Sequence, residues 1–229
     1  AAPPPGTMAR RQALGVLSAP LLAGARGLQL PSAAPPAAPL AQYGPGVQWG
    51  ADGLPMLRGQ DHQDYPRAVP TGDGGAFIVW EDSRERGISY NPATVAIYGQ
   101  QVSPDGRPRW PDGGRRLTLH GALAPSVVTD GAGGVILAYS REERDRGFSR
   151  YVQRVDADGT PRWGVDGLLF SAAEPGRFTG PVRLVADGRG GAWAVWLVFY
   201  EGVGSNGEPI TTAITVQGQH VTADGRLDF

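Results

Sequence analysis

The chain contains the stretch Gly133-Gly134-Val135-Ile136-Leu137-Ala138-Tyr139, together with two close variants of it. The variants are Gly74-Gly75-Ala76-Phe77-Ile78-Val79-Trp80 and Gly190-Gly191-Ala192-Trp193-Ala194-Val195-Trp196. A nearly continuous apolar run of this kind is typical of a β-strand buried on both faces. The unit returns about every 55 to 60 residues, which indicates a repeat architecture.

A second phrase follows each copy of the first. Its copies are Gln101-Val102-Ser103-Pro104-Asp105-Gly106, Arg154-Val155-Asp156-Ala157-Asp158-Gly159 and His220-Val221-Thr222-Ala223-Asp224-Gly225. Each predicts a third strand that ends in a tight turn, where glycine supplies a positive φ at no steric cost. A first strand beginning at Pro66, Pro125 or Pro181 and a fourth strand opened by tryptophan complete a four-stranded unit.

These units predict an all-β fold, a β-propeller-like array of three four-stranded repeats at about 47–109, 110–162 and 163–229. The segment 47–53 reads as a fourth strand with no unit before it, and the last repeat stops at 226–229, where its own fourth strand should begin. We therefore expect the N-terminal strand to complete the last blade. Closed propellers have about four to eight blades. Three repeats thus form either a small ring, an open arc covered by a partner, or part of a longer protein.

Six aromatic residues recur at equivalent places in the units. They are Trp49, Trp80, Trp110, Tyr139, Trp163 and Trp196. A stripe of aromatic rings can line a sugar platform, but the repeated position favours packing between blades.

Two strings carry a family resemblance. Trp80-Glu81-Asp82-Ser83-Arg84 and Gln153-Arg154-Val155-Asp156-Ala157-Asp158-Gly159-Thr160-Pro161-Arg162-Trp163-Gly164 resemble bacterial secreted β-propeller repeats. The resemblance covers residues 47–229, and its motifs are structural turns and strands. The Asp-Gly-x-x-x-Trp spacing is also similar to the Asp-box of sialidase-type propellers, with the glycine displaced by one position. The resemblance implies a propeller fold and no catalytic residues.

Residues 1–42 are rich in alanine and proline and lack the alternating patterns of the body, residues 43–229. A cationic start at Arg10-Arg11, an apolar run over 13–25 and small residues at its end predict an export signal. The alternatives are a disordered linker and a retained arm that lies on a partner or a membrane surface. Export places the protein in the periplasm or outside the cell.

Composition narrows the function further. The formal net charge of -1 predicts no nucleic-acid partner, because there is no surplus of cations to neutralise phosphates. Cysteine is absent, which excludes disulfides, thiol catalysis and cysteine-based metal sites.

No catalytic motif stands out, and the sequence predicts neither a cofactor nor a metal. His62, His120 and His220 are far apart, and Asp156-Ala157-Asp158-Gly159 resembles the start of a calcium loop but is interpreted as a hairpin turn. A glycosidase needs two carboxylates at a defined separation. The candidates in number are Glu81, Asp82, Glu142, Glu143 and Glu201.

The loops after the second strands carry arginines that suit a docking face for a protein partner. They are Arg84, Arg86, Arg141, Arg144 and Arg146. We therefore expect a non-enzymatic, exported scaffold subunit that docks on a larger membrane-associated assembly, such as a respiratory or photosynthetic complex. The alternative is an extracellular glycan-binding or glycosidase-like propeller domain.

Overall fold

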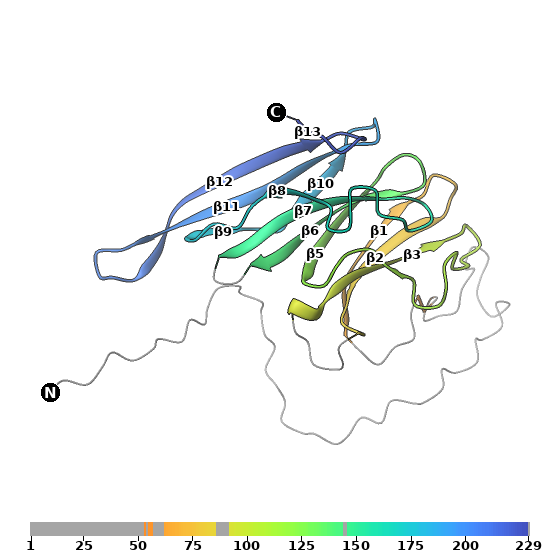
Figure 1. Cartoon of the computed structure of the whole chain (residues 1–229), viewed down its shortest axis with the longest axis horizontal. Helices are drawn as coiled ribbons and strands as arrows, with labels where there is room; N and C mark the ends of the chain where they lie inside the picture. Colours follow the sequence, from red (N-terminus) through yellow and green to blue (C-terminus); the bar gives the residue numbers. More distant parts are fainter. Residues whose placement is uncertain (1–52, 54, 57–61, 86–91, 144–145, 229) are drawn as a thin grey trace, which may run out of the picture. The chain divides into compact units, whose positions relative to one another are not determined.

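A computed structural model describes residues 53, 55, 56, 62–85, 92–143 and 146–228. These residues form three antiparallel β-sheets and no α-helix, with one 3-10 turn, η2, at Pro92–Thr94 (Figure 1). The described residues lie within one structural unit, residues 38–229. None of their helical segments has the length and apolar character needed to span a bilayer. The predicted all-β class is confirmed.

Each sheet runs through the chain in sequence order. The first sheet consists of β1 (Gln63–Pro70), β2 (Ala76–Asp82), β3 (Ala96–Val102) and β4 (Arg115–Arg116). The second sheet consists of β5 (Ala122–Thr129), β6 (Val135–Glu143), β7 (Gly147–Val155) and β8 (Leu168–Ser171). The third sheet consists of β10 (Arg183–Ala186), β11 (Ala192–Val203), β12 (Pro209–Val221) and β13 (Leu227–Asp228), and β9 (Arg177–Thr179) adds to it beside β11.

The sheets pack face to face through two apolar cores. In the first core, Phe77 and Val79 of β2 meet Val135 and Leu137 of β6, and Trp110 packs edge-on against Phe77 at a ring separation of 5.1 Å. The second core lies between the other face of β6 and the third sheet. It contains Ile136, Ala138, Val152, Val182, Ala192, Ala194, Trp196, Val198 and Val221. The second strand of the second sheet, β6, is therefore apolar on both faces because a neighbouring sheet covers each face.

The first strands of neighbouring sheets lie side by side, with β5 between β1 and β10. Strands β1 and β5 each carry a bulge where a proline follows a residue with positive φ. These residues are Tyr65, at 52°, and Ala124, at 53°. The Ala124 amide donates a hydrogen bond of 2.6 Å to Glu81 and so ties the second sheet to the first. Within the described residues the sheets share no ladder, and they do not form a closed barrel.

The fourth strands differ from the prediction. Trp110 and Trp163 do not open them, because the glycines that follow adopt positive φ and hold the chain in turns, as at Gly113 and Gly164. Strands β4 and β8 begin five residues after each tryptophan. The third sheet takes its fourth strand, β13, from the end of the last repeat. The segment 47–53, expected to complete the last blade, lies outside the described residues except for Gly53.

Candidate functional site

Two turns of each sheet meet at one edge of the molecule, and the glycine pairs shape that edge. Gly133 has a φ of 88°, which an L side chain rarely adopts. Gly134 lies so close to β7 that a Cβ on it would stand 2.3 Å from the Val155 carbonyl oxygen. The same approach recurs at Gly75 and Gly191. The glycine pairs thus bring the turn between the first and second strands onto the end of the third strand.

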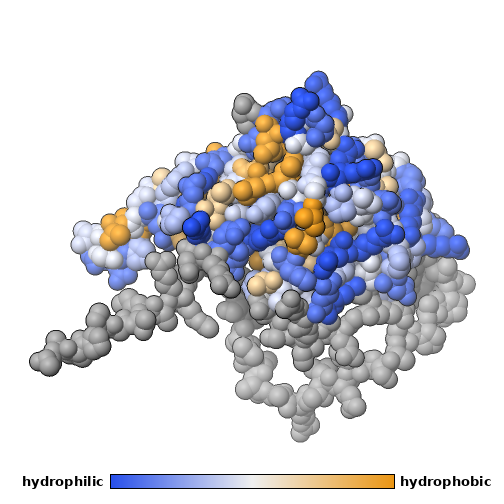
Figure 2. Space-filling model, viewed as in Figure 1, coloured by the Kyte–Doolittle hydropathy of each residue, from blue (hydrophilic) through white to orange (hydrophobic). Residues whose placement is uncertain are grey.

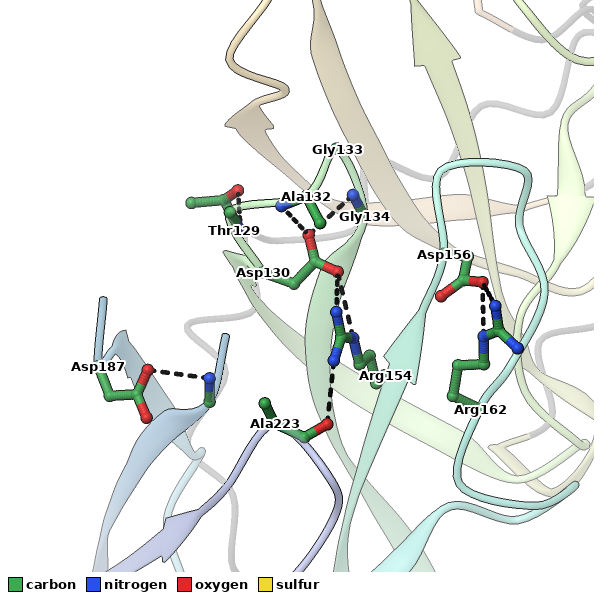
Figure 3. A network of polar contacts seen from close by, with 12 residues as sticks. Thr129, Asp130, Ala132, Gly133, Gly134, Arg154, Asp156, Arg162, Asp187 and Ala223 are labelled. Carbon is green, nitrogen blue, oxygen red and sulfur yellow. Dashed lines mark hydrogen bonds and ion pairs between the residues drawn. The ribbon is translucent and has the colours of Figure 1, made fainter. Parts of the chain in front are cut away.

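A buried aspartate organises this edge in the second sheet (Figure 3). Asp130 Oδ1 accepts hydrogen bonds from the amides of Ala132, at 2.8 Å, and Gly134, at 2.9 Å. Its Oδ2 accepts from Arg154 Nε at 3.2 Å and Nη2 at 3.0 Å. Both carboxylate oxygens are therefore engaged within the chain.

Arg154 also connects the second sheet to the third. Its Nη1 donates a hydrogen bond of 2.9 Å to the Ala223 carbonyl oxygen (Figure 3). Gln101, at the equivalent position of β3, donates to the Gly133 carbonyl oxygen at 2.7 Å. Each of these third-strand side chains crosses to the turn edge of the next sheet.

An open groove of about 400 Å³ lies beside Arg154, between the turn edges of the second and third sheets. It is lined by Thr129, Asp130, Gly131, Ala132, Arg154, Ala186, Gly188, Arg189, Gly190 and Ala223. A second hollow of about 350 Å³ shares Arg154 and Ala223 with this groove and continues past them. Its other lining residues are Asp156, Arg162, Trp163 and Asp224. We call the two hollows together the turn-edge groove.

The charges in the turn-edge groove balance. Asp130 pairs with Arg154, and Asp156 pairs with Arg162 (Figure 3). Asp224 is exposed, and the pKa of its carboxyl is lowered chiefly by the hydrogen bond from the Thr222 hydroxyl. With Arg189, the groove holds three carboxylates and three guanidinium groups.

Trp163 closes one end of the turn-edge groove. Its indole ring packs on the turn of the third sheet, where a Cβ on Gly225 would stand 2.8 Å from the ring. Trp110 covers Gly159 of the second sheet in the same way. The groove therefore joins an aromatic surface to charged and backbone hydrogen-bonding groups.

The equivalent edge of the third sheet is built differently. His220, which replaces Arg154, lies 3.0 Å from Asp187 and stacks on Trp193 at a ring separation of 4.8 Å. Burial raises the pKa of Asp187. The Arg189 amide, the His220 ring and the Gly191 amide together outweigh this effect and leave that pKa below its ordinary value. Trp193, His220, Leu227 and Asp228 line a shallow hollow.

Two of the arginines predicted to form a docking face are engaged within their own sheets. Arg84 pairs with Asp82 at 2.5 Å and lies over the Tyr98 ring. Arg141 pairs with Asp166 at 2.9 Å and lies over the Tyr151 ring. Arg146 is exposed in the turn before β7, whereas Arg86 and Arg144 lie outside the described residues. The structure thus places Arg84 and Arg141 in the packing of the sheets.

The repeated aromatic residues lie mainly in the interior. Trp80, Trp110, Tyr139 and Trp196 are buried, Trp163 is half-buried, and Trp49 lies outside the described residues. Of the candidate carboxylates, Glu81 and Asp82 are buried at the end of β2, Glu143 is half-buried, and Glu142 and Glu201 are exposed. These carboxylates do not line the turn-edge groove.

The remaining candidates fall into ordinary polar contacts. His120 lies 3.0 Å from Glu85. Asp158 accepts a hydrogen bond from the Thr160 amide, and an antiparallel bridge between Val155 and Pro161 closes its loop as a hairpin turn, as predicted. Across the described residues no cluster of histidine and acidic side chains is arranged to hold a metal ion.

Sequence patterns did not identify Asp130, Arg154 and Arg189 as groove residues. The sequence nevertheless carried a signal for two of them. Asp130 and Asp187 occupy the same place in two turns, and Gln101, Arg154 and His220 occupy the same place near the ends of the third strands. The groove itself arises from two sheets that meet, which no single repeat encodes.

Comparisons with known proteins give limited matches. No protein-family model matches the chain, and no curated protein matches it. Among solved structures, it is similar to an endo-arabinase from Bacteroides thetaiotaomicron, with 17% identity, 71% of this chain and 58% of that chain covered, and a TM-score of 0.42. An endo-1,4-beta-xylanase from the same organism matches at 12% identity over 73% of this chain and 63% of that chain, with a TM-score of 0.40. The chain thus spans less than two thirds of each.

These matches correct one expectation. The comparison contradicts the prediction of a non-enzymatic protein, because both matched structures are named as enzymes. At these TM-scores the likeness assigns no reaction, substrate or residue to this chain.

Proposed function

We propose that this protein recognises a neutral glycan in the turn-edge groove. The observation that carries the proposal is the composition of the groove: a charge-balanced set of arginine and aspartate side chains beside the Trp163 ring. Sugar hydroxyls both donate and accept hydrogen bonds, so they match a surface that offers guanidinium donors, carboxylate acceptors and turn amides. The apolar face of a sugar ring packs on an aromatic ring.

The balance of charge supports a neutral ligand over a polyanion. Polyanions such as nucleic acids need a surplus of cations. In the groove Arg154 and Arg162 are each paired with a carboxylate. The volume of about 400 Å³ in the larger hollow lies within the usual range of ligand sites.

The proposal places recognition on a rigid frame. Asp130 and Arg154 are fixed by turn amides and by the next sheet. Side chains held in this way lose little conformational entropy when a ligand binds. The exposed Arg189 lines the larger hollow and the exposed Asp224 lines the second, and both supply adaptable contacts.

The proposal includes the arrangement of the whole chain. We propose that the three sheets are blades of a propeller-type array, with the adjacent first strands β1, β5 and β10 along its inner side. Export from the cell, inferred from residues 8–25, would bring the groove to extracellular or periplasmic glycans.

The experiment uses matched positions of the repeat. Purified chain is titrated calorimetrically with xylan, arabinan, glucan, mannan and galactan, and with heparin as a polyanion. For the glycan that binds, we expect Asp224→Asn and Arg189→Ala to raise Kd about tenfold each, the loss of a hydrogen bond to a charged group. The controls are Asp105→Asn, which alters the equivalent turn residue of the first sheet, and Arg107→Ala, which removes its exposed partner.

The outcomes separate clearly. Binding that weakens equally in groove variants and controls would place the ligand elsewhere. Binding of heparin in preference to every neutral glycan would contradict the charge argument. Release of reducing ends from the bound glycan would show hydrolysis, which requires carboxylates. If Asp224→Asn is the one variant that abolishes this release, the proposal extends from recognition to hydrolysis.

A further inference from the structure

The outer face of the third sheet, which points away from the second sheet, continues a series of sheet interfaces. In the repeat, Phe77, Ile136 and Trp193 are equivalent, as are Val79, Ala138 and Val195. Phe77 and Val79 are 0% exposed because the second sheet covers them, and Ile136 and Ala138 are 0% exposed because the third sheet covers them. Trp193 is 44% exposed and Val195 is 37% exposed.

Strand register extends this apolar surface across the sheet. Val185 of β10 pairs with Trp193, and Val216 of β12 pairs with Leu197. The exposed apolar side chains of the face are Phe178, Val185, Trp193, Val195, Leu197, Ile214 and Val216. A strand that is apolar on both faces is typical of burial on both faces, and β11 has this composition from Ala192 to Val198.

The surface also reaches along the long β11–β12 hairpin. These strands have 12 and 13 residues, whereas β2 and β3 have seven each. Figure 2 shows apolar surface at the far end of this hairpin, where Val203 and Ile210 are exposed. The opposite end of the stack differs, because Trp80, Ala96 and Tyr98 of the first sheet are buried.

We infer that a second copy of this chain covers the outer face of the third sheet, so that two third sheets pack face to face about a twofold axis. In both existing interfaces another antiparallel sheet of the same repeat covers the equivalent face, and a second copy of this chain can supply such a sheet here. Among the sheet faces of the described residues, the outer face of the third sheet presents exposed apolar side chains from three neighbouring strands, and a second copy offers the same face. A twofold interface needs one patch that complements itself.

Charge at the two edges of the face selects the direction of the axis. Arg183 lies on β10 in register with Val195, and Asp228 lies on β13 in register with His220. These strands form opposite edges of the sheet. A twofold axis parallel to the strands sets β10 of one copy against β13 of the other, which brings each Arg183 toward Asp228 of its partner. An axis perpendicular to the strands would instead bring like charges together.

This inference is independent of the glycan proposal, and its test is the oligomeric state. Sedimentation velocity of the full chain over a hundredfold range of concentration should show a reversible dimer. Val216→Asp should raise the dimer Kd about a hundredfold or more, because the interface would bury an unpaired carboxylate on each copy. The matched control is Val165→Asp: Val165 is 67% exposed away from the face, and Val216 is 70% exposed on it.

A charge exchange tests the axis. Arg183→Glu and Asp228→Arg should each weaken the dimer, and the double variant should restore its Kd to within about tenfold of the starting value, since complementary charges fix register. Circular dichroism confirms that each variant is folded. A chain that stays monomeric at every concentration overturns the inference, and so does a dimer that Val216→Asp and Val165→Asp affect equally. A dimer weakened by the double variant as much as by the single changes overturns the assigned axis.

Discussion

The two glycines of each repeated pair meet different physical demands. Gly133 supplies a backbone with positive φ, whereas Gly134 supplies the absence of a Cβ next to the Val155 carbonyl oxygen. The same division holds in all three sheets. At the residue scale, backbone geometry therefore fixes the glycine pair of the repeat, whereas the polar side chains near it can differ between the sheets.

Gly134→Ala should be costly for a steric reason. The added Cβ would stand 2.3 Å from backbone, so strands β6 and β7 must separate locally. We expect the free energy of unfolding to fall by about 3 kcal/mol, measured by urea denaturation. Gly131→Ala is the control, because a Cβ there meets nothing within 4 Å and only its φ of 75° is strained, at a cost of about 1 kcal/mol. Equal losses at the two positions would contradict the close-approach argument.

Asp187→Asn should change how stability depends on pH. The folded protein lowers the pKa of Asp187 below 3.8, so the ionised carboxylate stabilises the fold. This contribution is fully present above pH 3.8, the ordinary value, and is lost as pH falls through the lower folded value. The difference in unfolding free energy between the wild type and Asp187→Asn should therefore be larger at about pH 6 than at about pH 2. Glu208→Gln, on the exposed hairpin turn, serves as the control, and a difference that does not change with pH would refute the expectation.

At the scale of elements, the second and third strands could be predicted from the sequence, and the fourth strands could not. The runs that begin at Ala76, Val135 and Ala192 are apolar and β-branched, and they form β2, β6 and β11. The sequence patterns after Trp110 and Trp163 likewise predicted strands that begin at these tryptophans. Glycines at positive φ, such as Gly114 and Gly167, keep them in turns until β4 and β8 begin.

Strand β9 was not predicted, and a buried cation holds it in place. Arg150 of β7 donates hydrogen bonds to the carbonyl oxygens of Thr179, at 2.6 Å, and Gly180, at 3.0 Å. Burial first, and then Arg177, lowers the pKa of Arg150 to about 10. The equivalent residues of the other sheets are Ile97 and Val216, so the contact is peculiar to this repeat.

Arg150→Ala should detach β9 locally without unfolding the rest of the third sheet. We expect amide hydrogens of Arg177–Thr179 to exchange about tenfold faster or more, because their anchor is lost and local opening becomes easier. Hydrogen exchange read by mass spectrometry measures this, with Arg107→Ala as a control in an exposed turn. Exchange over β9 that stays at the wild-type rate would show that Arg150 does not anchor it.

At the scale of the whole molecule, the repeat predicts three sheets, and their packing creates the functional surfaces. The turn-edge groove needs Asp130 of the second sheet and Arg189 of the third, which are brought together by a contact between sheets. We predicted a docking role for Arg84 and Arg141, but acidic and aromatic neighbours engage both residues. Sequence patterns report local periodicity well, whereas a groove between repeats depends on how the repeats face one another.

Nuclear magnetic resonance can locate the bound glycan and so test recognition in the turn-edge groove. Isotope-labelled protein is titrated with the neutral glycan that binds, and changes in amide chemical shift are mapped on the sheets. We expect the largest changes on Gly131, Ala132, Gly188, Arg189 and Asp224. Largest changes on the outer face of the third sheet, around Trp193 and Val216, or on β1 and β2 of the first sheet, would contradict this expectation.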